Sequence, residues 1–294
     1  MSERSRLRLS KHHGAGNDFL VLLDPDDDVA LSGEQVRALC DRHRGVGADG
    51  LVRARLVPGV QALSMELRNA DGGEAEMSGN GIRCLVQAAV DAGLVAPGDV
   101  VVHTRAGVRT VRYRTGDRPG LGYASVDMGA VVLGDELPVP DVPGARSARR
   151  VDVGNPHVVV LGAPVEPDAV ARHGAPIEHT VEGGANVEFV WPGPSEGELT
   201  MQVWERGVGP TLACGTGACA AAAAAHAWGV AGRRVRVHNL GGPLDVTLVD
   251  ERAELAGPTQ WVGDVTVDTS VLATLVESPG APDPSLAWEV ATRP

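Results

Sequence analysis

Lysine is almost missing from this chain of 294 residues, in which Lys11 is the only one. A pyridoxal-phosphate enzyme needs a lysine for its Schiff base, and Lys11 lies in a polar leader that we expect to precede the first strand. The chain also lacks a phosphate-binding P-loop, and no G-x-G-x-x-G fingerprint opens a strand–turn–helix unit. We therefore expect no common organic cofactor.

Basic charge and long apolar runs are also scarce. The formal net charge is −12, which argues against a nucleic-acid partner because phosphate binding relies on clustered lysine and arginine. No apolar run approaches the roughly 20 residues of a membrane span, so we expect no membrane partner. The first ten residues are polar and lack the apolar core of a signal peptide, and we expect a cytoplasmic location.

Cysteine is sparse as well, with four residues at positions 40, 84, 214 and 219. In a reducing compartment they are expected to be thiols. No two of them form a C-x-x-C pair, which argues against a zinc site, and we expect no bound metal. Cys84 and Cys219 lie one turn into helical runs, and we interpret both as small core residues.

Short β-branched runs and a few helical runs make up most of the chain. Its length predicts two domains of ordinary size, and many strands with few helices predict an α+β fold. A loop is predicted over 134–149. Helices are predicted over Gly33–Cys40, Ile82–Ala92, Glu166–His173 and Ala218–Trp228. Strands are predicted over Leu20–Leu23, Leu51–Val57, Val100–His103, Val108–Tyr113, Ala124–Met128, Val158–Leu161, Val187–Val190, Leu199–Trp204, Arg234–His238, Leu244–Val249 and Val265–Val267.

Two glycine motifs each precede a helical run. Residues 77–81 read Met-Ser-Gly-Asn-Gly, and residues 213–217 read Ala-Cys-Gly-Thr-Gly. They put Ser78 and Cys214 at glycine-lined helix N-termini, where free N–H groups bind anions and lower the pKa of a thiol. The two motifs are the predicted halves of one active site, although serine is a far poorer acid or base than cysteine.

The motifs belong to a longer internal repeat. Asn17 precedes Ser78 by 61 residues, and Asn155 precedes Cys214 by 59. Asn69 and Glu205 each lie nine residues before Ser78 and Cys214 respectively. Matched offsets in the same order favour a duplicated and diverged half, although a chain with 38 glycines also produces such turns by coincidence.

A boundary near residue 122 gives each half one Gly-Asn turn and one of the two motifs. We predict an N-terminal half of residues 1–122 plus 268–294, which carries Ser78. The C-terminal half is predicted over residues 123–267 and carries Cys214. Related halves would place the two residues at a pseudo-twofold cleft, where small-molecule chemistry is usual.

Two acid/base groups on opposite sides of one carbon suit inversion of a stereocentre. One group removes a proton and the other delivers a proton to the opposite face. N–H groups at both helix starts would hold a carboxylate and stabilise the carbanion. Other polar residues suit supporting roles, with Glu205 and His157 in proton transfer and Arg206 on a distal carboxylate. Each also has an ordinary interpretation as a turn residue, a satisfied histidine or a strand-end ion pair.

The run His13-Gly14-Ala15-Gly16-Asn17-Asp18-Phe19 resembles the opening signature of the diaminopimelate epimerase family. Further segments that resemble the family follow in its order over roughly residues 11–270. They are Asp41-Arg42-His43-Arg44-Gly45-Val46-Gly47-Ala48-Asp49-Gly50, Arg68-Asn69-Ala70-Asp71-Gly72, Gly154-Asn155-Pro156-His157, Asn186-Val187-Glu188-Phe189, and Glu205-Arg206-Gly207-Val208-Gly209 leading to Ala213-Cys214-Gly215-Thr216-Gly217.

The resemblance implies two pseudosymmetric α/β domains, each a curved and mostly antiparallel sheet around a central helix. It implies a cofactor-independent homodimer that converts LL- to meso-diaminopimelate for lysine and peptidoglycan synthesis. It implies that Cys214 and Ser78 hold the catalytic positions, with His157 assisting the first base and Glu205 the second. The substrate contacts that it implies are Asn17, Asn69, Gly79, Asn80, Asn155, Asn186, Glu205, Arg206, Gly215 and Thr216.

Two positions depart from the family pattern. The family has cysteine where this chain has Ser78, and it usually has glutamate at Pro210, which removes a backbone N–H just before the Cys214 loop. Three interpretations of Ser78 stay open. They are an engineered Cys-to-Ser variant with little activity, a natural Ser/Cys racemase or epimerase of another amino acid, and a one-base lyase that uses Cys214. A non-catalytic amino-acid binder is a further alternative.

Overall fold

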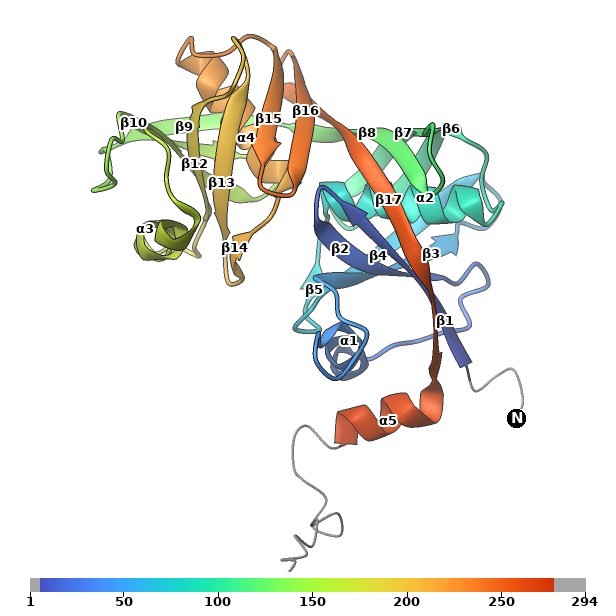
Figure 1. Ribbon diagram of the computed structural model, residues 1–294. Coiled ribbons are helices and arrows are strands. Elements are labelled where there is room, and N and C mark those ends of the chain that lie inside the picture. The colour runs from blue at the N-terminus through green and yellow to red at the C-terminus, as the bar shows by residue number, and fades with distance from the viewer. Residues whose placement is uncertain (1–5, 278–294) are drawn as a thin grey trace, which may run out of the picture.

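The computed structural model describes residues 6–277 and shows two lobes joined by long strands (Figure 1). The first lobe contains β1 (Arg6–Gly14), β2 (Asn17–Leu23), α1 (Gly33–Cys40), β3 (Gly50–Leu56), β4 (Ala62–Asn69), β5 (Glu74–Ala75), α2 (Gly79–Asp91), β6 (Gly98–Thr104), β7 (Gly107–Thr115) and the start of β8 (Leu121–Ala130). Next come β9 (Val132–Leu137), β10 (Ser147–Asp152), β11 (Pro156–Leu161), η2 (Pro167–Ala169), α3 (Val170–Glu178), β12 (Asn186–Pro192), β13 (Leu199–Glu205), β14 (Gly209–Thr211), α4 (Gly215–Ala227), β15 (Arg234–Asn239), β16 (Gly242–Val249), β17 (Arg252–Asp268) and α5 (Thr269–Glu277).

The two lobes pair their strands in the same pattern. In the first, β2 is parallel to β3, β3 is antiparallel to β4, and β4 is parallel to β6. In the second, β11 is parallel to β12, β12 is antiparallel to β13, and β13 is parallel to β15. The other pairs in each lobe are antiparallel, and α1 and α3 occupy matching positions on the two lobes (Figure 1). The predicted α+β fold of two related, mostly antiparallel halves is confirmed.

Strands β8 and β17 connect the lobes. β17 pairs with β16 at its start, with β8 through Arg252–Gln260, and with β1 at its end, where Asp268 lies opposite Arg6. β8 pairs with β7 of the first lobe, and β9 pairs with β10 of the second. The predicted division after residues 122 and 267 falls inside these two strands and stays a prediction. Its segment 278–294 lies outside the described residues.

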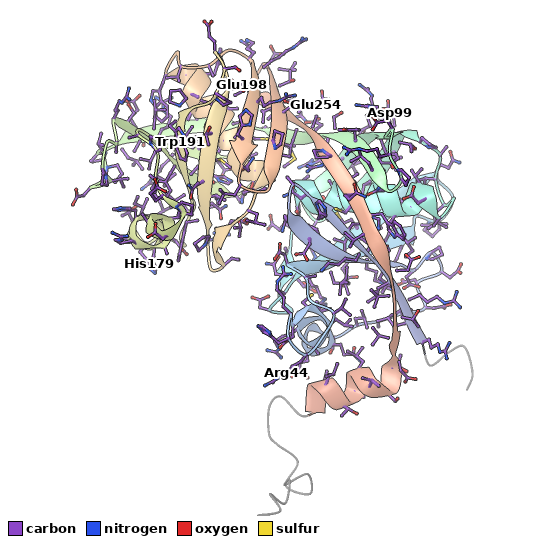
Figure 2. The ribbon with its side chains drawn as sticks, viewed as in Figure 1. Arg44, Asp99, His179, Trp191, Glu198 and Glu254 are labelled. Atoms are coloured by element: carbon purple, nitrogen blue, oxygen red, sulfur yellow. The ribbon has the colours of Figure 1, made fainter. Side chains whose placement is uncertain are left out.

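Helices α2 and α4 form the centres of the two lobes. Residues Gly79 to Ala89 of α2 are buried, and the buried face of α4 consists almost entirely of alanine. Helix α4 is apolar on nearly all sides, as is typical of a helix in a core, and its small side chains let sheet and helix approach closely. Charged residues such as Arg44, Asp99 and Glu254 are exposed on the outside of the lobes (Figure 2). No helix within residues 6–277 is long and apolar enough to cross a membrane.

Two expectations about local structure were wrong. The polar leader around Lys11 is strand β1, in which Leu7 and Leu9 point inward while Arg6 and Arg8 are exposed. The predicted loop 134–149 contains the end of β9 and the start of β10, because its prolines all lie between the two strands. The predicted strand Val265–Val267 is confirmed and is the end of the longer β17. The expected helix Glu166–His173 is present as η2 and α3, while the other predicted helices and strands match observed elements.

Burial of His12 predicts a pH-dependent stability. The ring is fully buried, with Nδ1 3.1 Å from Gln87 Oε1 and Nε2 2.9 Å from Ser10 Oγ. Burial lowers the pKa of His12 from 6.5 to about 4. Between these values the unfolded chain binds a proton that the folded chain does not, so stability falls as the pH falls. Urea unfolding should show a loss of roughly 3 kcal/mol from this group between pH 6.5 and pH 4.

The control is His12→Gln, which should be less stable at neutral pH but should lose that part of the pH dependence. Equal pH slopes for both proteins would contradict this account of His12.

Candidate active site

Ser78 and Cys214 are the N-caps of two helices of equal length, 13 residues each. Their backbones are nearly identical, with φ −137° and ψ 123° at Ser78 and φ −122° and ψ 120° at Cys214. Ser78 Oγ accepts a hydrogen bond of 3.0 Å from Gly81 N, and Cys214 Sγ accepts one of 3.3 Å from Gly217 N. The two residues are therefore structural equivalents, as the sequence repeat predicts.

The first turns of α2 and α4 touch each other. A Cβ atom on Gly215 would lie 3.5 Å from Gly79 Cα, and on either glycine it would lie within 2.8 Å of a Leu255 methyl group. Only glycine lets the two helix starts approach this closely. Within residues 6–277, the amide N–H groups of Gly79, Asn80, Gly215 and Thr216 have no hydrogen-bond acceptor. Two sets of free N–H donors at positive helix ends thus adjoin.

Asn80 connects the two halves at this contact. Its Nδ2 donates to Asn17 Oδ1 at 3.1 Å and to the carbonyl of Ala213, next to Cys214, at 3.4 Å. Arg83 donates to Asn80 Oδ1 at 2.7 Å and to Gly79 O at 2.9 Å. Burial lowers the pKa of Arg83 to about 10, so it stays charged at neutral pH. No carboxylate among the described residues pairs with it.

A hydrogen-bonded series of side chains lies beside Cys214. Cys214 Sγ is 3.4 Å from Thr216 Oγ1, and Asn155 Nδ2 donates to that hydroxyl at 3.5 Å. Asn155 Oδ1 is 3.0 Å from His157 Nε2. The imidazole Nδ1 is 2.7 Å from Glu188 Oε1. The cysteine, the histidine and this acid are all buried.

Asn186, Glu205 and Arg206 form a second group of polar residues near Cys214, in which Asn186 lies opposite His157 in the sheet. The backbone N–H of Arg206 donates to Asn186 Oδ1 at 2.9 Å, and its exposed guanidinium donates to Gly183 O. Thr211 donates to Glu205. Burial raises the pKa of the Glu205 carboxyl, and the negative charge of Glu188 adds to this shift against the Thr211 bond.

The expected lowering of the Cys214 pKa is wrong for the chain in this structure. Burial raises this pKa well above that of a free thiol, and the charges of Glu205 and Glu188 raise it further. The helix N-terminus and the Gly217 hydrogen bond act in the opposite direction. A helix end contributes up to about 2 kcal/mol in a partly buried geometry, whereas burial shifts a pKa by up to about 3–5 units. Cys214 is therefore a neutral thiol here.

Some predicted site residues have no described hydrogen bond to the side chains around Cys214. Asn69 ends β4 opposite Gly50 and is exposed. Ser78 has its described hydrogen bond within its own helix start. Pro210 lies in β14 opposite Trp204 and is exposed. All four cysteines are buried free thiols, as expected for Cys84 and Cys219 as core residues.

Two buried charged residues, Arg83 and Glu188, had no predicted role in the site. Glu188 lies in an otherwise apolar strand, Asn186–Pro192, at a position where all neighbours are buried. An acid in such a run was a usable signal. Arg83 follows Ser78 by five residues, inside a helix whose other side chains are mostly apolar.

Gly217 should tolerate no side chain, because a Cβ there would lie 2.6 Å from Glu188 Oε1. In Gly217→Ala the carboxylate must move and lose its bond to His157, which should destabilise the fold by about 1–3 kcal/mol. Gly232→Ala is the matched control, since nothing lies within 4 Å of a Cβ there, and its stability should change by less than about 1 kcal/mol. Urea unfolding measures both, and equal stabilities would contradict the contact.

The chain matches known proteins along most of its length. The family model "Diaminopimelate epimerase" matches residues 9–134 and 149–262. A diaminopimelate epimerase of Desulforudis audaxviator is 40% identical over 284 residues, which cover 88% of this chain and 98% of the relative. The diaminopimelate epimerase of Mycolicibacterium paratuberculosis is 38% identical over 281 residues, covering 87% and 95%.

Solved structures share the fold at low identity. A predicted epimerase from Pseudomonas aeruginosa superposes with a TM-score of 0.69 at 17% identity, covering 89% of this chain and 99% of that chain. A hydroxyproline epimerase from Agrobacterium vitis superposes with a TM-score of 0.67 at 17% identity, covering 94% and 100%. The solved structures show a shared fold, and the family model and the sequence relatives show that the chain belongs to the diaminopimelate epimerase family.

Proposed function

We propose that this chain is an isomerase that binds diaminopimelate where α2 and α4 meet, and that it inverts the LL form to the meso form without a cofactor. One observation carries the proposal. Ser78 and Cys214 are equivalent N-caps of two helices whose first turns touch at Gly79 and Gly215. Family membership supplies the substrate, which serves lysine and peptidoglycan synthesis.

The free N–H groups of the two helix starts hold the α-carboxylate in this proposal. Gly79, Asn80, Gly215 and Thr216 would donate to it, and the same donors would stabilise negative charge that spreads from the α-carbon into the carboxylate. A group on one face removes the α-proton, and a group on the opposite face returns a proton. No atom is gained or lost, and the two groups exchange protonation states.

Cys214 is the effective acid/base group of this chain. Glu205 would assist it, which agrees with the influence of the Glu205 charge on the Cys214 pKa. Ser78 occupies the opposing position, where its hydroxyl is a very weak acid. The family resemblance gives His157 the role of assisting proton transfer at that position, while its hydrogen bonds in this structure connect it to the Cys214 side through Asn155 and Thr216. The epimerase should therefore be slow as long as residue 78 is serine.

Polar residues around the helix contact would bind the remaining groups of the substrate. Asn17, Asn69, Asn155 and Asn186 offer amide donors and acceptors for the ammonium and carboxylate groups. Exposed Arg206 offers a guanidinium to the distal carboxylate. We also propose a homodimer in the cytoplasm, as the family resemblance implies.

Ser78→Cys should increase the rate of diaminopimelate epimerisation by about 10²–10⁴-fold, the range typical of a positioned general acid or base. The measurement is the conversion of LL- to meso-diaminopimelate by chiral chromatography. Ser78→Ala should stay as slow as the parent and controls for changes in packing. An unchanged rate in Ser78→Cys would count against diaminopimelate as the substrate.

Solvent deuterium exchange separates the alternatives for Ser78. A chain in which only Cys214 removes a proton should exchange the α-hydrogen of one stereoisomer much faster than that of the other. Loss of ammonia or water during exchange would favour a one-base lyase. Exchange from neither isomer would favour a non-catalytic binder.

The raised pKa of Cys214 predicts how its reactivity depends on pH. Because the thiolate is the nucleophile, alkylation by iodoacetamide should accelerate about tenfold per pH unit from pH 7 to pH 9, without reaching a plateau. Peptide mass mapping follows the modified residue, and Cys214→Ala identifies the signal. A plateau below pH 8 would show that the thiol ionises readily and would contradict the assignment.

A further inference from the structure

Glu188 is a fully buried acid that lies behind the first turn of α4. One oxygen, Oε1, contacts His157, whereas Oε2 has no hydrogen-bond partner among the described residues. A buried carboxylate with an unpaired oxygen is costly for stability. Gly217 leaves room for it, since even a Cβ there would come within 2.6 Å of Oε1. The fold therefore keeps an acid where an apolar residue would pack more favourably.

The hydrogen bonds of His157 determine how many protons the group holds. Both of its partners, Glu188 Oε1 and Asn155 Oδ1, are oxygen acceptors when the acid is ionised. Two hydrogen bonds to two acceptors need two protons. In this arrangement both ring nitrogens of His157 donate, Nδ1–H to Glu188 Oε1 and Nε2–H to Asn155 Oδ1.

The same bonds fix the direction of the next side chain. The Asn155 amide oxygen faces the ring, where Nε2–H donates to it, and the amide nitrogen faces Thr216. The Thr216 hydroxyl in turn lies 3.4 Å from Cys214 Sγ. Without the imidazole N–H, no hydrogen bond in this series would prevent the Asn155 amide from rotating so that its oxygen and nitrogen exchange places.

The other half of the molecule shows that the fold does not require this acid. Phe19 of β2 lies opposite Gly50, as His157 of β11 lies opposite Asn186. Two residues along the neighbouring strand, Val52 takes the place of Glu188. A Cβ on Gly81, which corresponds to Gly217, would lie 3.4 Å from a Val52 methyl group. An apolar pair therefore lies behind Ser78, and a proton-holding pair lies behind Cys214.

We propose that Glu188 is a positioning residue, which through His157 holds Asn155 in the orientation that presents its amide donor to Thr216 beside Cys214. The acid touches neither the thiol nor the bound substrate in this role. The proposal rests on the proposed function only in treating Cys214 as the reactive thiol. The placement of His157 and Asn155 is testable without any turnover.

The decisive comparison is between Glu188→Val, which copies the apolar half, and Glu188→Gln. A glutamine amide can donate to Nδ1 and leave Nε2–H on Asn155, so it should preserve the arrangement without the charge. The first readout is the solvent exchange of the His157 ring N–H by ¹H–¹⁵N NMR, with the signal assigned by His157→Gln. It should be protected in the parent and in Glu188→Gln, and should exchange at least tenfold faster in Glu188→Val.

The second readout is the α-hydrogen exchange of diaminopimelate, measured in the chain as it stands and with Ser78→Cys. Glu188→Val should lower this rate by about 10²-fold, and Glu188→Gln should restore most of it. Val159→Ala removes buried volume next to Glu188 in the strand register without touching a hydrogen bond, and should retain the rate.

Three results would overturn the proposal. They are a protected ring N–H in Glu188→Val, a loss in Glu188→Gln as large as in Glu188→Val, and a loss in Val159→Ala of the same size. If neither form of the chain exchanges the α-hydrogen, the proposed function fails, while the ring N–H still decides the role of Glu188.

Discussion

The contact between the first turns of α2 and α4 is the constraint on which the rest of the site depends. Gly79 and Gly215 have no side chains, so the two helix starts approach until their backbones nearly touch beside Leu255. This approach brings two sets of free N–H groups and two N-cap side chains to one place. Strands β8 and β17, which connect the two lobes, hold the two helix starts in place relative to each other.

The two halves have matching backbones but different side chains around the site. Behind Ser78 the pleat presents Phe19 and Val52, whereas behind Cys214 it presents His157 and Glu188. The buried cation Arg83 belongs to the Ser78 half, and the carboxylates of Glu188 and Glu205 lie near Cys214 in the other half. The duplicated fold thus supplies the symmetry that inversion of a carbon needs, while side chains make the two faces different.

Charge and burial oppose the helix end at Cys214. The partial positive charge of the N-terminus favours a thiolate, but two carboxylates and the removal of water favour the thiol. The structure therefore holds Cys214 in its protonated form. Any group that brings positive charge next to this thiol would lower its pKa, and the ammonium of an amino-acid substrate is such a group.

The sequence by itself determined the two helix starts, their repeat and the family, because these depend on local patterns such as a polar cap followed by glycine and small residues. It also determined most strands and helices, since their apolar periodicity is local. It missed β1, where arginines that alternate with inward-pointing leucines look like a polar leader, and the full length of β17, whose strand character comes from partners in both lobes. Only the tertiary structure decided that Asn80 reaches Ala213, that Glu188 lies behind Cys214, and that the Cys214 pKa is raised. Each of these depends on burial and on neighbours that are far apart in the chain.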